Sequence, residues 1–75
     1  MDQQRQLTAI IEREGDGYVA LCPELDIASQ GESVENARAN LAEAVELFFE
    51  TADTSEVERW LHTEVYVTRL DVARG

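Results

Sequence analysis

Alternating apolar positions in the first third of the chain predict a β-hairpin followed by a short third strand. Residues 7–14 are rich in β-forming side chains, and their apolar positions fall mainly on one face. The turn Gly15-Asp16-Gly17 comes next, and glycine tolerates the positive φ of a tight hairpin. Residues 18–22 are expected to form the returning strand, which ends at Pro23 because proline has no backbone N–H to donate. Residues 27–29 are predicted to form the third strand.

An amphipathic helix is predicted from Val34 to about Thr51. Its apolar residues recur at spacings of three and four and form one stripe: Val34, Ala37, Leu41, Ala44, Val45 and Phe48. The opposite face is charged: Glu35, Arg38, Glu43, Glu46 and Glu50. Ser33 has the chemistry of an N-cap, and Glu35 lies near the positive end of the helix dipole. One face of this helix is therefore expected to be buried.

A second short helix and a last strand are predicted towards the C-terminus. Asp53 and Glu56 have the spacing of a capping box, with helical turns expected through Trp60. Residues 63–72 alternate like a strand. The order strand, strand, strand, helix, strand predicts an α+β fold, a two-layer sandwich with one amphipathic helix on a mainly antiparallel sheet. Residues 1–75 are expected to form a single domain.

The last predicted strand carries apolar residues on both faces, which suggests self-association. A single helix covers only one face of a sheet, and an apolar patch on the other face usually marks an interface. A domain of this length is also marginally stable alone, and its single cysteine, Cys22, excludes an internal disulfide. We therefore expect a homodimer or homotetramer; the alternative is a normal scatter of surface apolar residues. The interface residues expected are Tyr66, Leu70, Val72 and Trp60.

Charge narrows the classes of partner. The net charge is -10, and all six basic residues are arginine. Such a chain repels phosphate backbones, so direct nucleic-acid binding is not expected, whereas attraction to a basic protein is. Simple solubility is the alternative explanation of the acidity. The N-terminus has neither a basic region nor an apolar core, which predicts a cytoplasmic protein without a membrane span.

Catalysis is not predicted, and no cofactor or metal is expected. His62 is the only histidine and fits a structural role better than that of a general base. Cys22, at a strand end, is expected to be a small buried side chain. A magnesium site is conceivable from four carboxylates, although solvated surface explains them more simply. These carboxylates are Glu12, Glu24, Asp26 and Glu32.

The stretch GDGYVALCPELDIASQGESVENARANLAEAVELFFE, residues 15–50, resembles the HicB family of bacterial antitoxins. The features that carry the resemblance are a G-Y-V strand, a Pro-acid-Leu corner, a G-E-S helix start and an E-A-V-E helix end, in that order. TEVYVTRLDVA, residues 63–73, is similar to the closing strand of that family. The resemblance covers residues 7–72.

The resemblance implies a binding function. HicB proteins neutralise HicA toxins, which are small basic ribonucleases that cut mRNA, and their antitoxin domain has a degraded ribonuclease-H-like fold. This chain is accordingly expected to be the antitoxin of a type II toxin–antitoxin system that occludes a HicA-like toxin. The residues implicated in toxin binding are Pro23, Glu24, Leu25, Asp26 and Glu32, with Gly31 and Ser33 setting the approach to the helix.

Two departures from the family pattern limit what carries over. Many relatives continue into an operator-binding segment, whereas this sequence stops at Gly75, so operator binding by this chain is not expected. The family corner also commonly has Pro-Gly where this chain has Asp26-Ile27. Two alternatives stay open: a solitary homo-oligomeric adaptor without a toxin, and a carboxylate-metal nuclease.

Overall fold

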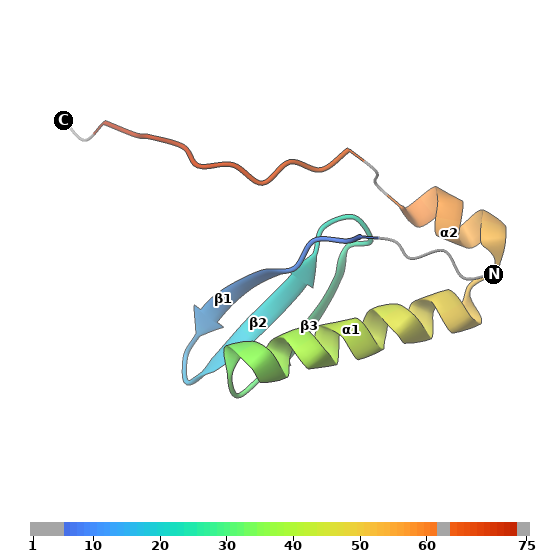
Figure 1. Cartoon of the computed structure of the whole chain (residues 1–75), viewed down its shortest axis with the longest axis horizontal. Helices are drawn as coiled ribbons and strands as arrows, with labels where there is room; N and C mark the ends of the chain where they lie inside the picture. The colour runs from blue at the N-terminus through green and yellow to red at the C-terminus, as the bar shows by residue number, and fades with distance from the viewer. Residues whose placement is uncertain (1–5, 62–63, 74–75) are drawn as a thin grey trace.

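The computed structural model describes residues 6–61 and 64–73 and shows an α+β fold (Figure 1). The elements in chain order are β1 (Ile10–Glu14), β2 (Gly17–Cys22), β3 (Ile27–Gly31), α1 (Val34–Thr51) and α2 (Thr54–Trp60). The predicted hairpin, third strand and main helix are therefore confirmed. No helix in the described part of the chain is long and apolar enough to cross a membrane.

The three strands form one antiparallel sheet in the order β1-β2-β3. Glu14 pairs with Gly17, so the β1–β2 connection is a two-residue turn. Gly15 has φ 61° in this turn, a conformation that glycine adopts without the steric cost of a side chain. The hairpin signal in the sequence thus reflects a real backbone requirement.

Helix α1 packs across β3 and β2 and covers β1 much less (Figure 1). Its contacts with the sheet enclose a small core of Ala20, Cys22, Leu25, Ala37 and Leu41. Ala20 and Cys22 are two residues apart on β2, and Ala37 and Leu41 are one turn apart on α1. Side chains at these spacings share one face of a strand and one face of a helix. Val34, by contrast, was predicted to belong to the buried stripe but is 43% exposed at the first turn of the helix.

Hydrogen bonds tie the start of α1 to the end of β3. The Ser33 hydroxyl accepts from the Asn36 N–H at 3.0 Å, which confirms the predicted N-cap. The Asn36 side-chain oxygen in turn accepts from the Glu32 N–H at 2.9 Å, and the Asn40 amide donates to the Gln30 carbonyl at 2.8 Å. The orientation of α1 on the sheet is therefore set at its N-terminal end.

The predicted capping box opens α2. Asp53 accepts from the Glu56 N–H at 2.8 Å, and the Glu56 carboxylate accepts from the Asp53 N–H at 3.3 Å. The Glu56 N–H and then the Ser55 hydroxyl hold the pKa of Asp53 below its ordinary value. The short helix ends at Trp60, as predicted, and buries Val57.

The predicted last strand is not part of the sheet, which corrects the sequence-based interpretation. Residues 64–73, here called the C-terminal arm, form neither strand nor helix and extend away from α2 (Figure 1). Residue 63 of the predicted strand lies outside the described residues. Alternation favours an extended backbone, but a strand also needs a neighbour to pair with, and alternation does not supply one.

Candidate protein-binding surfaces

The Pro-acid-Leu corner between β2 and β3 turns two of its side chains inward. The Leu25 N–H donates to the Cys22 carbonyl at 3.3 Å, and the Leu25 side chain enters the core. Glu24 is 8% exposed and Pro23 is half-buried. Only Asp26 of the four corner residues is exposed to a partner.

Glu24 binds the chain segment that precedes β1. Its carboxylate accepts from the Thr8 N–H at 2.9 Å and from the Thr8 hydroxyl at 2.6 Å. Burial would raise the pKa of Glu24, but the hydrogen bonds that its carboxylate accepts, with those from Thr8 the strongest, together outweigh burial and hold this pKa below its ordinary value. Glu24 therefore has a structural role: its carboxylate joins the N-terminal segment to the end of β2.

Thr8→Val is expected to destabilise the fold by about 1.5–3 kcal/mol at neutral pH, because it removes a hydrogen bond to a charged carboxylate. The folded-state pKa of Glu24 lies below its unfolded value, so its stabilisation is present above the unfolded pKa and is lost as the pH falls through the folded pKa. The difference in unfolding free energy between the wild type and Thr8→Val should therefore become smaller in acid, below about pH 4.3. Urea unfolding between pH 2 and pH 7 measures both effects.

Thr8→Ser keeps the hydroxyl and serves as the matched control. It should lose clearly less stability than Thr8→Val and keep the wild-type pH dependence. Equal unfolding free energies for the two variants would show that the hydroxyl does not stabilise Glu24.

Cys22 is a buried packing residue, as expected from its position at the end of β2. Burial raises the pKa of its thiol, and the thiol also lies 3.5 Å from the Glu24 carboxylate, to which it donates. Both effects disfavour the thiolate, which is the nucleophilic form. Its role in the structure is thus that of a small apolar side chain.

Asp26 adopts φ 57°, the left-handed region that favours glycine. Aspartate and asparagine tolerate this region better than other residues with a side chain. This chain has Asp26-Ile27 where the HicB corner commonly has Pro-Gly, and the conformation of Asp26 is therefore compatible with a tight turn. The side chain of Asp26 points its charge into solvent, because the residue is exposed.

Asp26→Asn is expected to leave stability nearly unchanged, whereas Asp26→Val should cost about 1–2 kcal/mol because a β-branched residue is strained at this φ. Thermal unfolding of the two variants checks the difference. A valine variant as stable as the asparagine variant would mean that the turn relaxes to another conformation at little cost.

The proposed toxin-binding residues do not form one surface. Asp26 precedes β3 and Glu32 follows it, so the two carboxylates lie at opposite ends of the strand. Six residue steps along a strand correspond to roughly 20 Å. A partner that contacts both must span the length of β3.

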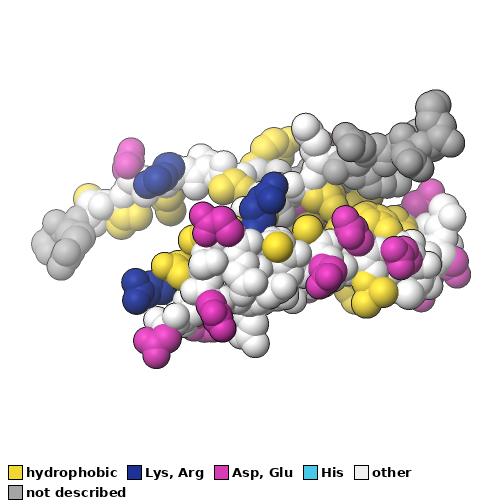
Figure 2. Space-filling model, turned by 60° about the horizontal axis from the view of Figure 1, so that its bottom comes forward, with side chains coloured by type: hydrophobic (Ala, Val, Ile, Leu, Met, Phe, Trp, Pro, Cys, Tyr) yellow, Lys and Arg dark blue, Asp and Glu magenta, His cyan; other side chains and the backbone are white. Residues whose placement is uncertain are grey.

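A shallow acidic groove lies between these two ends, where the outer side of α1 meets β3. It has a volume of about 430 Å³ and is lined by Ser29, Asn40, Glu43, Ala44, Glu46, Leu47 and Glu50. Leu47 is 59% exposed among the three glutamates. Figure 2 shows apolar and acidic side chains side by side on the face that carries α1. We call this the Leu47 groove.

Leu47 was not predicted as a contact residue, because the polar face of α1 was defined by its charged residues alone. The available signal was a leucine placed four residues after Glu43 and three before Glu50, a position where a solvated face needs no apolar side chain. Single exposed apolar residues are common on protein surfaces, so it is the acidic groove around Leu47 that makes this position a candidate contact.

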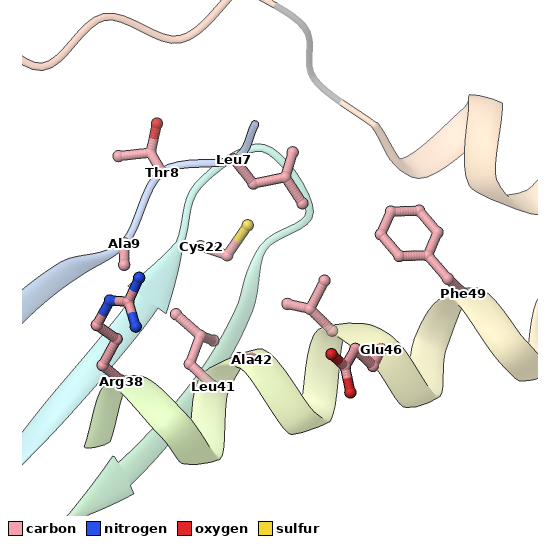
Figure 3. A pocket seen from close by; sticks show the side chains of 10 residues that line it. Leu7, Thr8, Ala9, Cys22, Arg38, Leu41, Ala42, Glu46 and Phe49 are labelled. Carbon is pink, nitrogen blue, oxygen red and sulfur yellow. The ribbon is translucent and has the colours of Figure 1, made fainter. Parts of the chain in front are cut away.

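A second, larger groove opens between α1 and the segment leading into β1, where the helix leaves the sheet uncovered (Figure 3). Its volume is about 700 Å³, and we call it the β1 groove. Leu7, Cys22, Leu41 and Phe49 contribute apolar side chains, while Arg38 and Glu46 of α1 carry charges at its margin. The remaining lining residues are Thr8, Ala9, Ala42 and Val45.

The residues predicted for the homo-oligomer interface are exposed in the structure. Tyr66 is 82% exposed and Leu70 is 84% exposed, and Val72 and Trp60 are also exposed. Three of the four belong to the C-terminal arm, while Trp60 ends α2. His62 lies outside the described residues.

The carboxylates considered for a magnesium site are not brought together. Within residues 6–61 and 64–73 no group of three or more His, Cys, Asp or Glu side chains is placed to hold a metal ion. Glu24 is instead directed onto Thr8, and Asp26 and Glu32 are separated by β3.

Comparison with known proteins identifies relatives by sequence. A UPF0150 protein of Synechocystis is 47% identical over 47 residues, which are 60% of this chain and 65% of that protein, just under two thirds of its length. A UPF0150 protein of Helicobacter pylori is 38% identical over 52 residues, which are 68% of this chain and 72% of that protein. No family model matches the chain, and no solved structure matches it. The extent of the second match shows that this chain belongs to the UPF0150 family.

Proposed function

We propose that the protein is a HicB-type antitoxin that binds and occludes a small basic, mRNA-cleaving ribonuclease of the HicA type. The observation that carries the proposal is the Leu47 groove, in which an exposed leucine is surrounded by Glu43, Glu46 and Glu50. The resemblance of residues 15–50 to HicB proteins supports the same partner class.

The chemistry of the Leu47 groove suits a basic protein surface. Protein interfaces concentrate affinity in a few central anchors, and charges around them set orientation and association rate. Leu47 would supply the anchor, and the three carboxylates would pair with basic side chains that otherwise bind RNA phosphates. The net charge of -10 adds long-range attraction, so the complex should form faster and more tightly at low salt.

Inhibition would follow from occlusion and needs no reaction by the antitoxin. A ribonuclease whose basic surface is covered cannot bind its RNA substrate, and one antitoxin copy per active site is enough. We accordingly propose a protein without catalytic activity or cofactor that works in the cytoplasm, where mRNA is the toxin's substrate. In this proposal Asp26 adds a peripheral charge, while Glu24 and Leu25 shape the corner from inside.

A second candidate function is a solitary homo-oligomeric adaptor of the same fold. The exposed apolar residues of the C-terminal arm favour self-association independently of any toxin. An adaptor of this kind would use its arm for assembly and would leave the Leu47 groove without a ribonuclease partner.

Recovery of partners from the host distinguishes the two functions. The tagged chain is purified from its own host at low salt, the column is washed with increasing salt, and co-eluting chains are identified by mass spectrometry. The antitoxin proposal predicts a small basic protein that leaves at high salt. Recovery of this chain alone, as a dimer or larger assembly, would favour the adaptor.

A further inference from the structure

We infer that the C-terminal arm of one copy docks as an added β-strand in the β1 groove of a second copy. The inference gives a mechanism to the proposed self-association and does not depend on the existence of a toxin. Three features carry it: an unpaired strand-like arm, an unpaired sheet edge, and an apolar groove at that edge.

The arm has the side-chain pattern of a strand without the pairing of one. Tyr66, Leu70 and Val72 share one parity along residues 64–73, with Thr68 between them. All three apolar side chains are more than 70% exposed. An extended segment of this kind leaves both its backbone hydrogen-bonding groups and its apolar face available to another sheet.

The free edge lies on the side of the molecule that α1 leaves open. β1 pairs only with β2 in the described sheet, so its other edge has no strand beside it. The β1 groove lies next to this edge, between α1 and residues 7–9, which lead into β1, with Leu7, Val45 and Phe49 among its apolar lining. A strand added to β1 would place one of its faces over this groove.

The shape of the chain favours a second copy as the occupant. A compact chain of this length has an expected radius of gyration of about 11 Å. The observed value is 14.5 Å, with a longest extent of 51 Å. The arm contributes to the excess because it projects beyond α2 and does not pack on the sheet (Figure 1).

Exchange of arms between two copies would cover the exposed arm and the unpaired β1 edge of both copies. Each arm would cover the other copy's β1 edge, and twofold symmetry uses each arm and each β1 edge once, so no unpaired arm is left to recruit a third copy. The small core of each domain would gain apolar contacts that one copy does not provide in this conformation.

Light scattering and sedimentation of the full chain over a concentration series test the inference with two pairs of variants. Ala42→Glu places a charge in the β1 groove, and Ala39→Glu makes the same change on an exposed position of α1 that does not line this groove. Leu70→Asp alters the arm, and Val34→Asp makes a similar change at an exposed apolar position of α1. Far-UV circular dichroism should be the same for all four, because each altered side chain is exposed.

The expected result is a wild-type dimer whose dissociation constant rises at least about tenfold in Ala42→Glu and in Leu70→Asp, but not in the two controls. Hydrogen exchange of the wild type provides a check without variants: amides of the arm should be protected only at concentrations where the dimer forms. Because each copy carries the same charge, added salt should strengthen the dimer, whereas it should weaken a complex with a basic toxin.

Three results would overturn the inference. A monomer at all concentrations with protected arm amides would mean that the arm folds back onto its own sheet. A monomer with unprotected amides would mean that nothing covers the arm. A dimer that Ala42→Glu leaves intact would mean that the arms meet elsewhere. None of these results bears on whether a basic ribonuclease binds the Leu47 groove.

Discussion

Gly31→Ala is expected to destabilise the fold by about 3 kcal/mol, at the upper end of the usual range for overpacking. A Cβ atom at this position would lie 2.5 Å from the Ala37 backbone nitrogen and 2.8 Å from the Ala37 Cα atom. The obstruction is helix backbone, which cannot rotate away as a flexible side chain could. The end of β3 and the first turn of α1 would have to separate.

The separation would also disturb the hydrogen bonds that set the position of α1. The Cβ atom would lie 2.6 Å from the Asn36 side-chain oxygen, which accepts from the Glu32 N–H in the native structure. A domain of this size has a total stability of only about 4–11 kcal/mol. The melting temperature should therefore fall by roughly 10 °C or more in a thermal scan.

Gly15→Asn is the matched control for the loss of a glycine. Gly15 needs its positive φ but has no atom near the position of a Cβ, and asparagine tolerates that conformation. The control should lose less than about 1 kcal/mol. If Gly31→Ala proved as stable as Gly15→Asn, the close approach of β3 to α1 would not be a requirement of the fold.

Leu47→Arg is expected to weaken binding of the proposed basic toxin about 30-fold or more. Removing a central interface anchor typically costs 2 kcal/mol or more, which corresponds to that factor. Arginine also neutralises part of the field of Glu43, Glu46 and Glu50 and repels a basic surface. Stability should change little, because Leu47 is mostly exposed and arginine is a good helix former.

Val34→Arg supplies the control on the same helix. Val34 is an exposed apolar residue at the first turn of α1, outside the Leu47 groove, and the change in charge is the same. Isothermal titration of the two variants with the toxin separates a local contact from a general effect of charge. Equal affinities for the two variants would place the toxin on another surface.

Local signals in the sequence predicted much of the fold. Ser33 and the pair Asp53 and Glu56 act within a few residues of themselves, so their capping roles are readable without knowledge of the tertiary structure. The glycine turn at Gly15 is equally local. The predicted order of three strands and a helix followed from these signals and from the two periodicities.

Features that depend on distant parts of the chain were less accessible. Residues 63–72 have the alternation of a strand, but pairing requires a free edge in the right place, which no pattern specifies. The sequence around Glu24 is typical of a surface acid next to a turn. Only its contact with Thr8, sixteen residues earlier, shows that its side chain faces inward. The separation of Asp26 from Glu32 likewise depends on the extended path of β3.

The most direct test of the antitoxin proposal is a titration of RNA cleavage. The small basic protein recovered with this chain is given an mRNA substrate, and cleavage is followed as the purified chain is added. The proposal predicts that cleavage stops at about one chain per ribonuclease active site and returns when high salt or Leu47→Arg weakens the complex. Cleavage that continues at a large excess of the wild-type chain, under low salt, would contradict the proposal.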